Sequence, residues 1–394
     1  MPLTGRQTNH YIGLQSDEVT KATELIKMQA KSNDMEPTIE KVESEALTAN
    51  AVRDGAAVTF IYCDGSIPVQ LTLETLPIFL LIYGFAEELA PVQVSTAIAT
   101  AANSGDTNIE VDSSKGIEEG VTLTLDDGTN TEEVTVDYVQ GGKVHLAGAL
   151  TNVYSIGDTI TLDRYKHILK FANKISYSAT IVRENEPEDR YYEFIGCRLS
   201  QMGVNATKDS YIENSAQAHS LSYNKVSGYP GDIESGYTVS EALGEILSLN
   251  TKVKLNNADI TADLNSFSLD LSNGLKTDDK GINSKNRRSL RMQSGKLNFN
   301  METVFDTARY EENQDKMKEG AYSNVEFNLG ISDNITCILP KIFFDNVSSP
   351  ASGEDDLTIS FETTCYNDKV QGTAAIFEII DSISSKYKDK YAVA

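Results

Sequence analysis

The stretch 259–303 decides the fold; it reads DITADLNSFSLDLSNGL from 259 to 275 and SGKLNFNMET from 294 to 303. In the first segment Phe267, Leu269 and Leu271 alternate with polar residues, and apolar residues again occupy every second position from 297 to 301. Strict alternation on both sides of a long polar loop predicts two half-buried antiparallel strands. Asn273-Gly274 should end the first strand, because both residues tolerate a positive φ.

An earlier part of the chain has the same layout. EPTIEKVESEAL is followed by a loop at 48–55 and by the strand AAVTFIYCD, and later come KISYSATIV, RYYEFIGCRLSQM and QAHSLSYN. The second half continues with SNVEFNLGI, NITCILPKIFF and DDLTISFETTCYND. Helix-length segments at 75–89 and 305–318 follow the two strand pairs, and the apolar residues of the first surround it, so it should be buried. We predict an all-β fold with a few short helices, built as a tandem duplication of one strand–strand–helix–strand–strand–strand unit.

This layout predicts six parts of the chain. They are an N-terminal arm at 1–35, a discontinuous first β domain at 36–94 and 163–228, an inserted acidic β-domain at 95–162, a linker at 229–250, a second β domain at 251–370, and a C-terminal helix and tail at 371–394. Within the arm, 16–31 is expected to be helical, with Ser16 as its cap. Isoleucines at 376, 379, 380 and 383 have the spacing of one helix face.

The predicted insertion differs from the rest of the chain in composition. Short Val/Thr/Leu segments are joined by the hairpin signals Asp127-Gly128 and Gly141-Gly142. Its 11 Asp and Glu against 2 Lys give it −9 of the net charge of −24. No calcium-loop pattern is present, so we interpret the acids as a solvated face.

The overall composition is that of a globular protein, with 40% hydrophobic and 23% charged residues among 394. The net charge of −24 argues against a sequence-specific nucleic-acid binder, and it is compatible both with simple solubility and with a surface that repels phosphate. The four cysteines lie far apart and match no zinc signature, so we expect free, mostly buried thiols. The longest apolar run, LPIFLLIYGF, is too short to span a bilayer, so no membrane partner is expected.

The loop at 276–295 is a basic island in this acidic chain. It carries the candidate contact residues Lys276, Lys280, Lys285, Arg287, Arg288 and Arg291. Three interpretations remain open: a mobile solvated loop, a loop that docks on an acidic face of another subunit, and a phosphate-binding loop. Loops of this length are usually functional or disordered.

The sequence contains little that indicates catalysis. His10, His145, His167 and His219 are scattered, and no G-x-S-x-G, Walker loop or dinucleotide fingerprint occurs. His219 lies in an alternating strand, where a packed residue is expected rather than a ligand. We therefore expect no enzyme, no catalytic residues, no cofactor and no metal.

The order of several motifs resembles the tail tube proteins of long-tailed bacteriophages. The motifs are GRQ, RYYEFIGCRLSQMGVNA, SFSLDLSNGL, GKLNFNMETVFD, CILPKIFFDNV and DDLTISFETTCYND, and they extend from residue 1 to about 370. The resemblance implies a β-sandwich with a flanking helix that assembles into stacked rings around a DNA conduit. It further implies a virion tail protein, assembled in the host cytoplasm, that meets itself, the tape measure, the terminator and the baseplate, while genome DNA passes through the lumen without specific binding.

Two tandem tube domains in one chain favour a homotrimeric ring with pseudo-sixfold symmetry, and a single lumen-lining half would instead require a homohexamer. The alternatives are a distal tail or baseplate ring protein of related fold and a carbohydrate-binding β-protein. The absence of Trp argues against sugar binding.

Overall fold

The computed structural model describes residues 8–43, 56–140, 142–172, 174–185, 190–227, 237–240, 246–248, 251–280, 284–329, 334–349 and 357–392. The first half contains β1 (Thr8–Leu14), β2 (Glu24–Lys27), β3 (Gln29–Ala30), β4 (Glu36–Glu43), β5 (Ala56–Gln70), α1 (Thr75–Tyr83), β12 (Ala179–Asn185), β13 (Arg190–Thr207), β14 (Glu213–Ser220) and β15 (Ser222–Ser227). Between α1 and β12 lie β6 (Phe85–Thr100), β7 (Asn108–Val111), β8 (Thr122–Asp126), β9 (Thr131–Gln140), β10 (Lys143–Leu146) and β11 (Thr159–Phe171). The second half contains β16 (Thr238–Ser240), β17 (Lys252–Leu255), β18 (Ala258–Asp259), a 3-10 turn (Thr261–Asp263), β19 (Leu264–Ser272), β20 (Lys296–Val304), α2 (Thr307–Glu319), β21 (Tyr322–Leu329), β22 (Ile335–Ser348), β23 (Thr358–Cys365), β24 (Ile376–Asp381) and α3 (Tyr387–Tyr391). The fold is all-β with a few short helices, as predicted.

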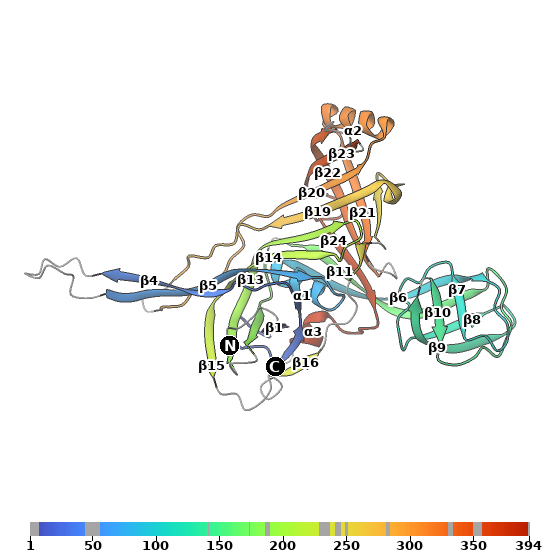
Figure 1. Ribbon diagram of the computed structural model, residues 1–394, viewed down its shortest axis with the longest axis horizontal. Helices are drawn as coiled ribbons and strands as arrows, with labels where there is room; N and C mark the ends of the chain where they lie inside the picture. The colour runs from blue at the N-terminus through green and yellow to red at the C-terminus, as the bar shows by residue number, and fades with distance from the viewer. Residues whose placement is uncertain are drawn as a thin grey trace, which may run out of the picture.

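A long antiparallel sheet runs through both halves (Figure 1). Its strand order is β4–β5–β14–β13–β19–β20–β23–β22. The pairing of Leu269 with Phe299 confirms the two strands predicted on either side of the basic loop. Both side chains are fully buried, because one face of this sheet covers the main core while the polar residues between them stay on the other face.

The two halves have the same strand order and share a bulge at the same place. In the first half, β5 leads to β14, β13 and β12; in the second half, β20 leads to β23, β22 and β21. A bulge interrupts β13 between Leu199 and Gln201, and a bulge interrupts β22 between Phe344 and Asn346 at the corresponding place. Beyond these strands, β1 pairs with β12 as β17 pairs with β21.

Helix α1 is buried along its whole length, as its apolar sequence predicts, and it packs on β13. It is shorter than the predicted 75–89, because Gly84 ends it with a φ of 132° and donates its N–H to Leu80. Helix α2 begins at the cap Asp306, whose carboxylate accepts a 2.7 Å hydrogen bond from the N–H of Arg309, and it packs on β22.

Two helix predictions are wrong. Residues 16–31 form a turn and the strands β2 and β3, because the Asp17 carboxylate accepts the N–H groups of Val19 and Thr20 and so competes with a helix. Residues 376–381 form β24, which lies between β11 and β22. Since both faces of β24 are buried, the spacing of its apolar residues cannot distinguish a helix from a strand.

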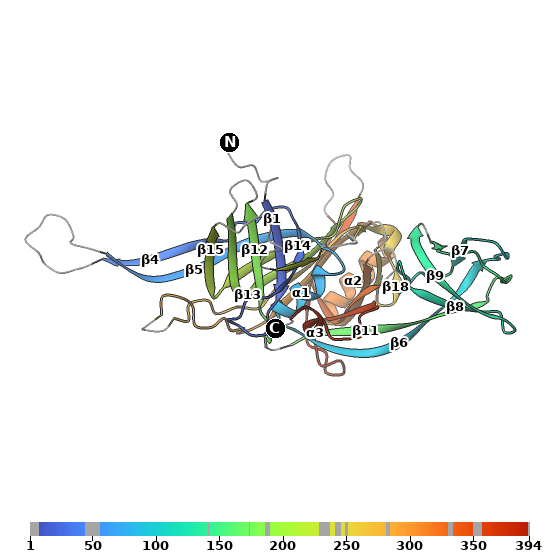
Figure 2. The same ribbon diagram turned by 90° about the horizontal axis from the view of Figure 1, so that it is seen from below.

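The acidic module, β7 to β10 with the ends of β6 and β11, has its own core around Leu123, Val144 and Tyr154. It lies at one end of the molecule, at the end of the paired strands β6 and β11 (Figures 1 and 2). Both strands run without a break through the predicted boundaries at 95 and 162. The module also contacts the main body, since the Asn334 amide oxygen accepts from the N–H of Gly116 at 2.6 Å. Most of the predicted linker at 229–250 lies outside the described residues.

Candidate assembly surfaces

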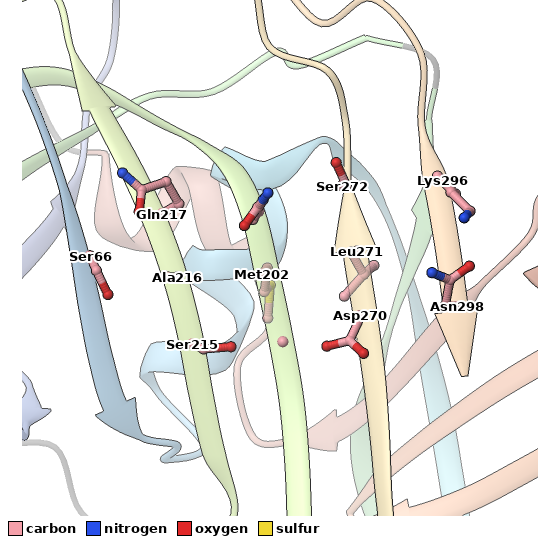
Figure 3. A pocket seen from close by; sticks show the side chains of 12 residues that line it. Ser66, Met202, Ser215, Ala216, Gln217, Asp270, Leu271, Ser272, Lys296 and Asn298 are labelled. Carbon is pink, nitrogen blue, oxygen red and sulfur yellow. The ribbon is translucent and has the colours of Figure 1, made fainter. Parts of the chain in front are cut away.

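The face of the long sheet that points away from the main core is polar; we call it the polar face. Figure 3 shows side chains that line a shallow hollow on it, from Ser66 on β5 across β14, β13 and β19 to Asn298 on β20. A second hollow shares Lys296 and Asn298 with the first and continues the same face to β23. The polar face therefore runs from the first half of the chain into the second.

Most side chains on the polar face are uncharged hydroxyls and amides. The charged residues that line its two hollows are Asp270, Lys296, Glu302, Asp345 and Glu362. Several polar groups bond one another, as when the Ser268 hydroxyl donates to Asp270 at 3.2 Å. A surface with four carboxylates and one ammonium group offers few partners to phosphate.

The long sheet ends in two open edges. Among the described residues, β4 pairs only with β5, and no strand pairs with β22 from Phe344 to Ser348 on the side away from β23. Exposed strand edges present unpaired N–H and C=O groups, which is a template for pairing with another chain. Ile39 and Val42 on β4 are 51% and 59% exposed, so apolar surface lies along the same edge.

The basic loop folds back on its own chain instead of standing free. Lys276 and Arg291 form an antiparallel bridge, as do Lys280 and Arg287, so the loop is an irregular extension of the β19–β20 hairpin. The carbonyl of Lys285 accepts a 2.6 Å hydrogen bond from the N–H of Ile61 on β5. The loop therefore lies beside the projecting β4–β5 hairpin, as both views show (Figures 1 and 2).

Arg287 holds the loop in this place. Its side chain is 2% exposed and forms a two-pronged ion pair with Asp64, with Nη2 at 2.7 Å from Oδ2. Its guanidinium lies 4.7 Å from the ring centre of Tyr62, and His219 adds a 2.8 Å hydrogen bond to the same carboxylate. Burial alone would raise the pKa of Asp64, but the hydrogen bonds from Arg287 and His219 hold it down at about 2.

The other five basic residues of the loop are exposed, and some pair with nearby acids. Lys280 lies 3.1 Å from Glu40 of β4, and Arg288 lies 3.4 Å from Asp279. Lys276, Lys285 and Arg291 also point a positive charge toward solvent. Arg287 therefore forms an ion pair within the chain, whereas the other five basic residues remain accessible to a partner.

A second buried charged cluster holds the C-terminal segment. His167 is fully buried, with Nδ1 at 2.6 Å from Glu87 and Nε2 at 3.2 Å from Asp381, and it stacks on Tyr387 at 4.0 Å. Burial alone would lower the pKa of His167, but the hydrogen bonds to Asp381 and Glu87 outweigh it and raise the pKa to about 9. This cluster ties α3 to β6, β11 and β24.

Several features of these surfaces were absent from the sequence predictions. Asp64 and Tyr62 were not singled out, although the alternation in AAVTFIYCD placed both on one face of β5. His219 is packed as predicted, between Asp64 and the hydroxyl of Ser200. All four cysteines are free and buried. In the part of the chain that the structure describes, no cluster of His, Cys, Asp or Glu is arranged to hold a metal, and no helix is long and apolar enough to cross a membrane.

Comparison with known families identifies the chain. The family model described as "Phage tail tube protein" matches residues 5–365, which includes both open edges, the polar face and the basic loop. No curated protein matches the chain. Because the family match covers nearly the whole sequence, this chain belongs to the phage tail tube protein family and has a structural role in a phage tail.

Proposed function

We propose that this protein is the tail tube subunit that self-assembles into stacked rings and forms the DNA-conducting tube of the virion. Three copies form one ring, and the polar face lines the lumen. Assembly takes place in the host cytoplasm, and the tube ends meet the tape measure, the terminator and the baseplate.

The single observation that carries this proposal is the repeated strand order. The sheets of the two halves are joined edge to edge by β13 and β19, from Gln201 opposite Ser272 to Thr207 opposite Ser266. One chain therefore contains two similar segments side by side in one sheet. Three such chains give six segments, which is the pseudo-sixfold ring, and closing the sheet removes both open edges.

The polar face supports its role as the wall of the lumen. Serine, asparagine and glutamine side chains bond water and one another, and the few carboxylates repel phosphate. DNA can then pass without being held at any site. The five exposed basic residues of the loop 276–295 dock on an acidic face of the next ring, because the chain carries a net charge of −24.

Negative-stain microscopy of the purified protein over a concentration series, together with native mass spectrometry, tests this proposal. We expect hollow filaments with a regular axial repeat and a mass of three chains per ring. Closed single-layer rings at every concentration would favour a distal tail or baseplate ring protein instead. Monomers at every concentration would contradict self-assembly.

A further inference from the structure

The junction between the two halves of this chain is a template for the junction between two copies. It is formed by β13 and β19, and the open edges β22 and β4 are their counterparts in the repeated strand order. If the same junction recurs between copies, the pairing inside the chain also fixes which residues meet across the interface. This step rests on the proposed ring.

The register follows from matching the two halves. Gln201 is the first paired residue of β13 after its bulge opposite β14. Asn346 is the first paired residue of β22 after its bulge opposite β23, so Gln201 and Asn346 correspond. By the same matching, His219 on β14 corresponds to Thr364 on β23. His219 lies opposite Asp64 on β5, and Thr364 lies opposite Asn298 on β20. Asp64 and Asn298 therefore correspond.

The last strands then follow. Asp64 lies opposite Glu36 on β4, and Asn298 lies opposite Asp270 on β19, so Glu36 corresponds to Asp270 and Thr38 to Ser272.

We infer that β4 of one copy pairs antiparallel with the open edge of β22 in the next copy, with Thr38 opposite Asn346 and Glu36 opposite Ser348. Inside the chain, Gln201 lies opposite Ser272 and Gly203 lies opposite Asp270, so the proposed pairs are the equivalents of these two.

The chemistry of the matched positions agrees. Between the pairs Gln201–Ser272 and Gly203–Asp270, Met202 lies opposite Leu271, and both are buried on the core face of the sheet. The proposed counterpart is Val347 opposite Pro37, again two apolar residues. The alternation of polar and apolar faces therefore continues across the interface without a change of side.

The hydrogen-bond directions also agree. The N–H of Asn273 donates to Ser200 at 3.1 Å across the internal junction, and since bonded pairs alternate, Met202 and Leu271 form the next bonded pair. Their counterparts, Val347 and Pro37, should then turn the backbone hydrogen-bonding groups that they have toward the open edges. On β4 this holds, because the N–H of Asp34 donates to Ser66 of β5, which turns Glu36 toward β5 and Pro37 outward.

Pro37 has no N–H, so it cannot donate to Val347 as Leu271 can to Met202. The side-chain amide of Gln314 on α2 supplies a donor instead, since its Nε2 lies 3.4 Å from the carbonyl oxygen of Val347. Proline on an edge strand is also a usual protection against uncontrolled pairing. The β4 edge can therefore still pair with a partner strand, but the interface has one backbone hydrogen bond fewer than the β13–β19 junction.

A disulfide experiment tests the register. In this register Thr38 and Asn346 form a non-bonded antiparallel pair, whose Cα atoms are about 4.5 Å apart and within disulfide range. Oxidation of the full-length Thr38→Cys/Asn346→Cys variant under assembling conditions should give covalent dimers and trimers on a non-reducing gel. The native thiols do not interfere, because all four are buried.

Three controls accompany this variant. Gln201→Cys/Ser272→Cys reproduces the internal template and should give a disulfide within the monomer. Each single-cysteine variant should give no ladder. Glu36→Cys/Asn346→Cys is out of register by two residues, about 7 to 8 Å apart, and should cross-link far less.

The outcomes separate the two proposals. Rings seen by microscopy, with no ladder from Thr38→Cys/Asn346→Cys although the internal disulfide forms, would overturn this interface and leave the tube function standing. An equal ladder from the out-of-register variant would overturn the register. Failure of the unmodified protein to form rings at any concentration would overturn both.

Discussion

At the scale of single residues, Arg287 joins two parts of the chain that are 223 positions apart. Replacing it with alanine leaves the half-buried carboxylate of Asp64 without its main partner and frees the loop. We expect Arg287→Ala to lower the free energy of unfolding by about 2 to 3 kcal/mol, measured by urea denaturation. Arg288→Ala is the matched control, since its side chain is 66% exposed, and it should change stability by no more than about 0.5 kcal/mol. Equal effects of the two variants would contradict the assigned role.

His167 predicts a pH dependence of stability. Its pKa is raised to about 9 in the folded protein from an ordinary value of 6.5, so the folded state binds its proton more tightly. The stabilisation is fully present below about pH 6.5, falls as the pH rises toward 9, and amounts to about 3 kcal/mol at most. We expect His167→Gln to remove this decline between pH 6.5 and 9 in denaturation curves. His145→Gln, on the inserted module, should retain it, and a decline that persists unchanged in His167→Gln would refute the assignment.

At the scale of elements, the basic loop has one part bound inside the chain and another part accessible. Reversing two exposed charges, Lys285→Glu and Arg291→Glu, leaves Arg287 in place and should leave the ring intact. We expect filaments to shorten several-fold while rings still form, as counted by microscopy, because the attraction between rings is weakened. The same number of charges reversed at Lys143 and Lys208 is the control. Full-length filaments from the loop variant would show that the loop does not join rings.

The same scale shows what sequence patterns can and cannot predict. Strands β19 and β20 were predictable because only one of their faces is buried, which leaves a period-2 signal in Phe267, Leu269 and Leu271. β24 was not, because β11 and β22 flank it and both its faces are covered. The basic loop was recognisable by its charge, but the position of Arg287 depended on Asp64, and a single sequence carries no signal for such a distant pair.

At the scale of the whole molecule, the repeated order of elements was visible in the sequence, while the open edges were not. An edge is defined by which strand has no neighbour, and that depends on the complete pairing of the sheet. The stretch 95–162 was recognisable by its acidic composition, and its residues form a separate core. The hydrogen bond from Gly116 to Asn334, which joins this stretch to the main body, could not be predicted, because neither residue stands out in the sequence around it.

The β13–β19 junction changes the kinetics with which a ring can form. In the proposed ring of three chains, three of the six lateral junctions lie within single chains and form as those chains fold, and only three form between chains. Ring nucleation then depends on roughly the third power of monomer concentration instead of about the sixth, because a covalent linkage halves the number of separate chains that must meet. A tail made from such a chain can start at a lower subunit concentration, and each subunit is added as two segments whose order cannot be reversed.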